Sequence, residues 1–264
     1  MQFFRQRGFV LHYKWIDNKK PRTFLFINSL GTDFRIWDNV VEIVQEHGNI
    51  LLFDKRGHGL SDTEEGTNGL DDFSGDALAL LEHLSINKCI VVGVSVGGMI
   101  AQVMAHYHPE RIEKLMLCDT QSKIGDDAFW NDRIRKIESN GLSGIADGVI
   151  LRWFPESFRQ RFPEEVTGYR NMLERCSVKG YIQTCAAIRD ADLTAKSKEI
   201  KLPTMCIVGS EDQSTPPAGV ERLSKLISGS KFKQIEGSGH LPCVDNAEKL
   251  SAIIIDFINS NSSQ

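Results

Sequence analysis

The sequence lacks close cysteine pairs, blocks of like charge and any long apolar segment without glycine. Its six cysteines include no C-x-x-C pair, and most lie in apolar runs, where a free thiol behaves as a small hydrophobic side chain. This usage favours a reduced protein of the cytoplasm. The formal net charge of -4 gives no reason to expect nucleic acid or an anionic membrane surface as a partner. The opening residues, MQFFRQRGFVLHYKW, have no apolar core of the kind that a secretory signal carries.

The stretch CIVVGVSVGGMIAQVMA, Cys89–Ala105, contains no charged residue. It is short for a membrane span, which needs roughly 20 apolar residues, and it carries three glycines around Ser95. We therefore interpret it as a buried strand over Cys89–Val94, a sharp turn, and a helix that begins near Val96. No membrane span is expected.

Short apolar runs alternate with segments of helical period along most of the 264 residues. Continuous apolar strands separated by helices predict an α/β fold with a mostly parallel sheet and helices on both faces. The predicted strands are residues 10–15, 23–28, 49–54, 89–94, 112–119, 202–209 and 231–236.

Residues 122–199 interrupt this alternation, because they are helix-like throughout and contain no convincing strand. The sheet pattern resumes directly after them, which disfavours an independent helical domain. We expect residues 1–121 and 200–264 to form the α/β core, and residues 122–199 to be a helical cap inserted over the carboxyl edge of the sheet.

Ser95 lies at the centre of GVSVG, a G-x-S-x-G pattern between the predicted strand and helix. A tight strand-to-helix turn needs small flanking residues and exposes the serine hydroxyl at a helix N-terminus, where backbone N–H groups favour negative charge. The pattern alone is weak evidence, since a glycine-rich turn can carry an incidental serine. The strand before it and the helix after it favour a nucleophile.

A serine nucleophile needs a base, and His240 is the best placed of the seven histidines. It lies in GSGHLP, a loop between the last predicted strand and the final helix, whereas we expect surface or packing roles for the others. The base needs a carboxylate partner, for which Asp212 is preferred over Asp119 and Glu211. The order Ser95, Asp212, His240 is the serine, acid, base order of the α/β-hydrolases.

An oxyanion formed at Ser95 needs backbone donors. One expected donor is the N–H of Val96, the residue after the nucleophile, and the other is the N–H of Leu30 in the NSLG loop after a predicted strand. There is no phosphate-binding glycine loop, no G-x-G-x-x-G after the first strand and no H-E-x-x-H. These absences give no reason to expect a cofactor or a metal.

Distinctive segments are spread over nearly the whole chain: NSLGTDFRIWD, FDKRGHGLSD, GVSVGGMIAQ, CDTQSKIGDDAFWNDRI, RWF, AAIRDADL and GSGHLPCVDNAE. Together they resemble the 3-oxoadipate enol-lactonases of the α/β-hydrolase superfamily. The cap segments matter most, because many esterases share the core motifs. NSLG replaces the HG motif of many relatives, and the residues around His240 are also slightly varied. The resemblance implies the α/β-hydrolase fold with an eight-stranded sheet.

The resemblance implies hydrolysis of a five-membered enol-lactone that carries a carboxymethyl group, a step of the β-ketoadipate route of aromatic degradation. Ser95 would attack the ring carbonyl with His240 as base, and water would then release 3-oxoadipate from the acyl-enzyme. The free carboxylate of such a substrate calls for a guanidinium partner. The cap offers Arg133, Arg135, Arg152, Arg175 and Arg189 for this role. We choose Arg133 first and also Arg189, with Trp130 and Trp153 as walls of the pocket.

Two other functions stay open at this point. A general carboxylesterase or perhydrolase of the same fold would prefer neutral esters and gain nothing from Arg133. A non-catalytic small-molecule-binding protein would have no need of Ser95, Asp212 and His240 together. The expected partner is a small-molecule lactone, and the sequence leaves a homo-oligomer open.

Overall fold

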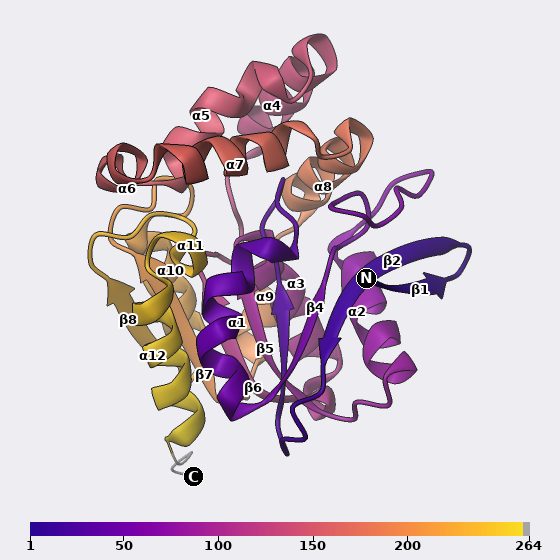
Figure 1. The fold of residues 1–264 in the computed structure, drawn as a ribbon, viewed down its shortest axis with the longest axis vertical. Coiled ribbons are helices and arrows are strands. Elements are labelled where there is room, and N and C mark those ends of the chain that lie inside the picture. Colours follow the sequence, from indigo (N-terminus) through magenta and orange to yellow (C-terminus); the bar gives the residue numbers. More distant parts are fainter. Residues whose placement is uncertain (261–264) are drawn as a thin grey trace.

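The computed structural model describes residues 1–260 and places eight of their segments in one sheet. The strands are β1 (Gln2–Gln6), β2 (Phe9–Ile16), β3 (Thr23–Ile27), β4 (Asn49–Phe53), β5 (Cys89–Val94), β6 (Ile112–Cys118), β7 (Thr204–Gly209) and β8 (Lys231–Ile235). Their order is β1-β2-β4-β3-β5-β6-β7-β8 (Figure 1). Pairing is antiparallel between β1 and β2 and between β2 and β4, and parallel in the rest of the sheet.

Helices cover both faces of the sheet, as the sequence predicts (Figure 1). One face carries α1 (Asp38–Val44), α11 (Pro242–Asp245) and α12 (Ala247–Asn259), and the other carries α2 (Leu70–His83), α3 (Val96–Tyr107), α9 (Thr194–Glu199) and α10 (Pro217–Leu226). Short 3-10 helices span Phe34–Trp37, Gln45–His47 and Pro109–Arg111. Every residue of β3, β4, β5 and β7 is buried, because helices exclude water from both faces. The predicted α/β fold is confirmed.

The edge strand β1 is the element that the sequence analysis did not predict. Three of the five residues in its sequence, QFFRQ, are polar, and Phe3 is 51% exposed. The strand is held by antiparallel pairing with β2 rather than by burial of an apolar face. A strand stabilised mainly through its backbone leaves little trace in a hydrophobic pattern.

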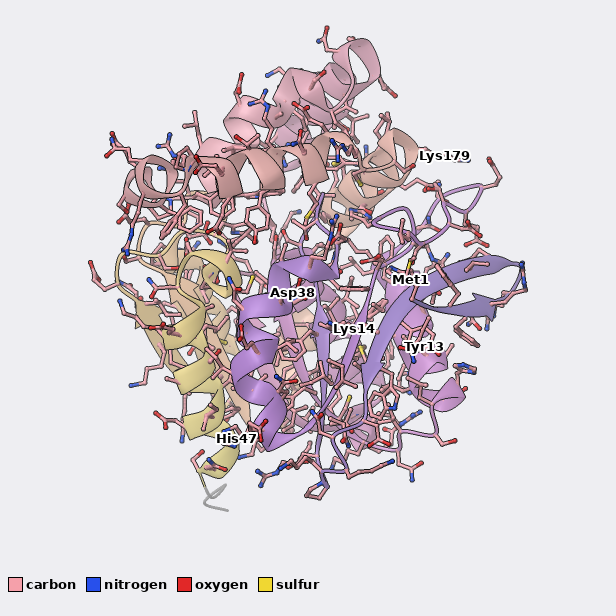
Figure 2. All side chains as sticks on the ribbon, viewed as in Figure 1. Met1, Tyr13, Lys14, Asp38, His47 and Lys179 are labelled. Carbon is pink, nitrogen blue, oxygen red and sulfur yellow. The ribbon has the colours of Figure 1, made fainter. Side chains whose placement is uncertain are left out.

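A group of cap helices lies over the carboxyl ends of the parallel strands, at the top of Figure 1. They are α4 (Asp127–Asn140), α5 (Ser143–Trp153), α6 (Glu156–Arg161), α7 (Pro163–Glu174) and α8 (Val178–Asp190), and all follow β6 and precede β7. Side chains fill much of the space between these helices and the sheet, and Asp38 marks the cap-side end of α1 (Figure 2).

The next helix, α9, belongs with the core in its contacts. It packs against α3 beside the sheet, and the Ser197 hydroxyl donates a 2.8 Å hydrogen bond to Gln102 Oε1. The cap boundary that we propose at residue 199 therefore includes one helix that contacts the core. In residues 1–260, no helix has both the length and the apolar character needed to cross a membrane.

Candidate active site

The turn at Ser95 is sharp and strained. Ser95 joins β5 to α3 with φ 60° and ψ -123°, a backbone conformation that residues other than glycine rarely adopt. A Cβ added at Gly93 would collide with the Gly97 carbonyl, and one at Gly97 would collide with the Ile27 carbonyl. Both glycines are therefore needed for the close approach of strand, turn and helix. Strain of this kind at a serine that lines a cavity is typical of a nucleophile.

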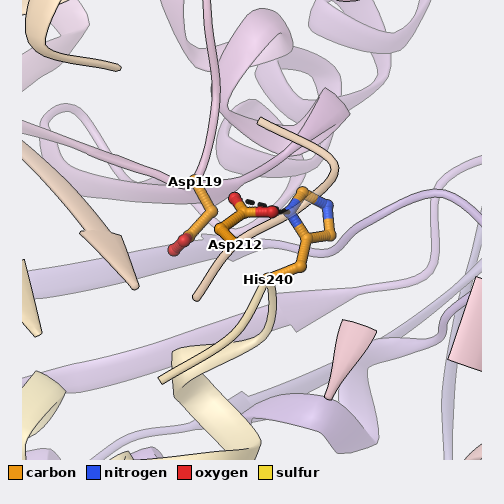
Figure 3. Close-up of side chains that lie close together, drawn as sticks. All are labelled: Asp119, Asp212 and His240. Atoms are coloured by element: carbon orange, nitrogen blue, oxygen red, sulfur yellow. Dashed lines mark hydrogen bonds and ion pairs between the residues drawn. The ribbon is translucent and has the colours of Figure 1, made fainter. Parts of the chain in front are cut away.

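The structure brings His240 and Asp212 together, each on a loop that follows a parallel strand (Figure 3). His240 Nδ1 lies 3.0 Å from both carboxylate oxygens of Asp212. Asp212 is also held by the Ser214 and Thr215 amides and by the Thr215 hydroxyl, at 2.7, 3.0 and 2.5 Å. Burial alone would raise the pKa of Asp212, but the charge and hydrogen bond of His240, with the Thr215 bonds, keep that pKa below its usual value. Such a carboxylate can fix the tautomer of the imidazole.

The backbone of His240 is tied to the cap. Its N–H donates a 2.9 Å hydrogen bond to the carbonyl of Trp153, the last residue of α5. Ser95 and His240 line the same cavity, and in residues 1–260 the Ser95 hydroxyl makes no hydrogen bond within 3.5 Å. Catalytic hydrogen bonds in ligand-free enzymes are often long and tighten when substrate binds.

Asp119, the rival acid, lies behind Asp212 rather than against His240 (Figure 3). It is wholly buried at φ 46°, and its Oδ1 accepts a 2.8 Å hydrogen bond from the Gly209 amide. Its Oδ2 has no partner within residues 1–260. Burial, and then the negative charge of Asp212, raise the pKa of Asp119 well above its usual value. Glu211, the other rival, is exposed.

Asp119, Asp212 and His240 each offer a ligand atom, and these atoms lie within 4.8 Å of one another. Such spacing suits a metal ion, but both oxygens of Asp212 and the Nδ1 of His240 already bond to one another. Two carboxyls and one imidazole are thus arranged as a hydrogen-bonded acid–base pair with a second acid behind it. The expectation that the reaction needs no metal stays a prediction.

The two expected oxyanion donors flank Ser95. Val96 is the first residue of α3, where backbone N–H groups have no intrahelical acceptor, and Leu30 lies on the loop after β3 and lines the cavity. Within residues 1–260, neither N–H donates a hydrogen bond to a protein acceptor. Both are free to serve a ligand oxygen.

The cavity between the core and the cap encloses about 170 Å³, several times the ~30 Å³ that one water occupies in the liquid, so it suits a small molecule. Three of the four cap residues predicted for substrate binding line it: Trp130, Arg133 and Trp153. The Arg133 guanidinium lies over the Trp130 ring, 5.4 Å from its centroid. Polar groups of the core face this apolar, arginine-bearing cap across the cavity.

Arg189, the fourth predicted residue, does not line the cavity. Its guanidinium bonds to Asp190 at 2.7 Å and to Asn131 at 2.8 Å. Its neighbour Ile188 lines the cavity instead, because successive residues of a helix point about 100° apart. Arg189 is therefore not part of the site that we propose.

Tyr181 lines the cavity but was missed by the sequence analysis, and Arg152, which was considered there but not chosen, lines the cavity as well. Burial, and then the nearby Arg133 guanidinium, lower the pKa of Arg152. In residues 1–260, neither Arg133 nor Arg152 pairs with a carboxylate. The signal that could have found Arg152 is its spacing on α5 from Val149 and Trp153, which face the same cavity.

Known proteins resemble this chain in sequence over most of its length. Residues 22–177 match the model of a family described as the alpha/beta hydrolase fold. The 3-oxoadipate enol-lactonase 2 of Acinetobacter baylyi is 31% identical over 239 residues, which are 90% of this chain and 89% of that protein.

Solved structures give the same result. The enol-lactonase from Burkholderia xenovorans LB400 has a TM-score of 0.95 and 30% identity, with 98% of this chain and 100% of that chain covered. A hydrolase from Pseudomonas aeruginosa has a TM-score of 0.93 and 29% identity, with 98% of both chains covered. The resemblance to enol-lactonases that the motifs indicate is confirmed.

Proposed function

This chain belongs to the α/β-hydrolase family, and on that premise we propose that it is a serine hydrolase that opens 3-oxoadipate enol-lactone to 3-oxoadipate. The observation that carries the proposal is a small cavity with Ser95 and His240 on the core side and two arginines without carboxylate partners, among residues 1–260, on the cap side. The enol-lactonases among its relatives support the same substrate.

The proposed first step is attack of Ser95 Oγ on the lactone carbonyl. His240 removes the hydroxyl proton, and Asp212 stabilises the imidazolium through the hydrogen bonds at Nδ1. The tetrahedral oxyanion lies between the N–H groups of Leu30 and Val96. These donors are fixed before substrate arrives, so little reorganisation is needed as charge develops.

Collapse of the intermediate breaks the bond from the acyl carbon to the ring oxygen. The leaving group is an enolate that remains part of the same acyl chain and becomes a ketone when its carbon takes up the proton that His240 removed from Ser95, which returns His240 to its neutral form. It therefore needs less acid assistance than an amine leaving group. His240 then activates water, which attacks the acyl-enzyme, frees the Ser95 hydroxyl and completes the addition of one water to the lactone.

Recognition of the substrate carboxylate falls to Arg133 and Arg152. A partly buried guanidinium without an anionic partner is costly, and two close together repel each other. A carboxylate between them would relieve that repulsion and accept charge-assisted hydrogen bonds. A neutral ester would leave both cations uncompensated. The cap is thus proposed to select an anionic substrate, whereas the residues of the core perform the hydrolysis.

The test is a spectrophotometric assay of the enol-lactone with the wild type and Ser95→Ala side by side. Fast turnover that is lost in the variant supports both the reaction and the nucleophile. Hydrolysis of p-nitrophenyl acetate alone, dependent on Ser95, would retain the hydrolase and discard the lactone in favour of a general esterase. Inactivity toward both would favour a small-molecule-binding protein. A cytoplasmic location and a homo-oligomer stay predictions.

A further inference from the structure

Lys55 is a buried cation that the proposed mechanism does not use. Its side chain is fully buried, and its Nζ donates a 2.5 Å hydrogen bond to the carbonyl of Ser29. The position follows from strand register, since Ile27 at the end of β3 pairs in parallel with Phe53 at the end of β4. Ser29 lies two residues after Ile27 and Lys55 two residues after Phe53, so the two remain side by side beyond the strand ends.

The carbonyl of Ser29 accepts two further hydrogen bonds, from the Thr32 hydroxyl at 3.0 Å and the Thr32 amide at 3.4 Å. This carbonyl belongs to the same peptide group as the Leu30 N–H. Because a trans peptide is planar, its C=O and N–H point in opposite directions. Ser29 and Leu30 line the cavity, whereas Lys55 does not. The groups that hold the carbonyl, Lys55 and Thr32, therefore set where the Leu30 N–H points.

We propose that Lys55 is a positioning residue for the oxyanion site, which holds and polarises the Ser29–Leu30 peptide from the side away from the cavity. The inference rests on the proposed function, in which the Leu30 N–H stabilises the oxyanion. A cation on the carbonyl oxygen draws electron density from the peptide and makes its N–H a stronger donor. The effect matters most at the tetrahedral intermediate, when negative charge reaches the N–H.

Acidic groups surround Lys55 without forming an ion pair with it in residues 1–260. Burial lowers the pKa of Lys55 to about 7, against the opposing influence of Cys176, Asp54 and Asp33. In residues 1–260, no carboxylate lies within ion-pair distance of its Nζ. The carboxylate of Asp54 is instead bound by His12 at 2.8 Å and by the Phe34 amide at 2.9 Å. The Ser29 carbonyl is therefore the polar partner of this cation.

The test compares Lys55→Met, which keeps the length and removes the donor, with Lys55→Gln, which keeps a neutral donor. Lys114→Met is the matched control, because Lys114 is also buried and donates to backbone carbonyls, of Phe257 and Ile258, far from the cavity. The readouts are kcat and KM for p-nitrophenyl acetate, inhibition by phenylboronic acid, and the melting temperature. The boronic acid adds the Ser95 oxygen and places a tetrahedral anion in the oxyanion site.

Loss of a complete oxyanion donor costs about 100- to 1,000-fold in kcat, so a donor that is merely released should cost about 10- to 100-fold. We expect that loss of kcat in Lys55→Met, with KM changed less than about threefold. The affinity for phenylboronic acid should fall by about the same factor as kcat. Lys55→Gln should show a smaller loss of the same kind. Lys114→Met should lower the melting temperature and leave kcat and the boronic acid affinity unchanged.

Wild-type kcat in folded Lys55→Met or Lys55→Gln would overturn the proposal, as would a loss confined to KM with unchanged boronic acid affinity. If Lys55→Met does not fold, Lys55→Gln decides by the same criteria. The assay uses p-nitrophenyl acetate, so the role of Lys55 is tested even if the wild type fails to hydrolyse the lactone. A wild type inert toward this ester and toward a fluorophosphonate would overturn the proposed function itself, and with it the role of Lys55.

Discussion

The floor and the roof of the cavity are built from different kinds of structure. The floor, Ser95 with Asp212 and His240, stands on short loops at the carboxyl ends of parallel strands, where the sheet holds each backbone in place. The roof, Arg133 and Arg152, comes from the faces of cap helices α4 and α5. The floor is a network of hydrogen bonds, whereas the roof holds cations without carboxylate partners in residues 1–260.

This difference matches the two tasks that we propose for the site. Bond cleavage needs pre-arranged groups, and strand ends supply them with little freedom to move. Selection needs complementarity to one part of the substrate, and helix faces supply it by the choice of side chain. The two regions meet at the hydrogen bond from the His240 amide to the Trp153 carbonyl, so the position of the base depends on the cap. Changes to the floor should affect every ester, and changes to the roof only anionic ones.

The largest effect is expected from Ser95→Ala. Without the nucleophile no acyl-enzyme forms, and kcat should fall by about 10⁴-fold or more toward both the lactone and p-nitrophenyl acetate. Steady-state rates with the two substrates, at matched protein concentration, measure this. A loss confined to one substrate would contradict a floor shared by all esters.

Asp212→Asn is expected to cost about 10³- to 10⁴-fold in kcat. The amide keeps the size of the carboxylate but cannot stabilise the imidazolium, and it allows the wrong tautomer of His240. The loss should again be equal for the lactone and the neutral ester. If Asp119→Asn proved more damaging than Asp212→Asn, the assignment of the acid would have to change.

Arg133→Met and Arg152→Met should each lower kcat/KM for the lactone by about 10- to 100-fold, since a hydrogen bond to a charged group contributes about 1.5–3 kcal/mol. Hydrolysis of p-nitrophenyl acetate should change less than about threefold. Arg135→Met is the matched control, because Arg135 lies on the same helix α4 and is exposed. Equal losses toward both substrates would mean that the roof takes part in catalysis rather than selection.

Asp119→Asn should have the smallest effect on turnover, within about threefold, and should raise stability at neutral pH. The folded pKa of Asp119 is raised, so the folded chain binds more protons than the unfolded chain between the two pKa values, and stability falls as pH rises through that window. Asn avoids this penalty and retains an acceptor for the Gly209 amide. The melting temperature at pH 8 should exceed that of the wild type by at least about 2 °C, with a smaller difference near pH 4. A less stable variant at pH 8 would show that Asp119 is ionised and paired.

Much of the floor could be predicted from the sequence. The apolar strands and the glycines around Ser95 are local signals, and the order of Ser95, Asp212 and His240 selected the acid that now lies against His240. The roof was predicted less well, because which residue of a cap helix faces the cavity depends on the rotation of that helix. For this reason the prediction chose Arg189, which does not line the cavity, and did not choose Arg152, which does. Lys55 was missed because its partner is a backbone carbonyl, which the residue type at position 29 does not reveal.

The most direct test of the division between floor and roof uses the wild type and two substrates that differ in whether the carboxymethyl group carries a negative charge. These are the enol-lactone as the free acid and its methyl ester, which has the same ring and the same scissile bond, and kcat/KM is measured for each. We predict that the free acid is preferred by at least about tenfold, and that the preference disappears in the Arg133→Met, Arg152→Met double variant. Equal kcat/KM values for the two substrates in the wild type would contradict selection of an anion by the cap.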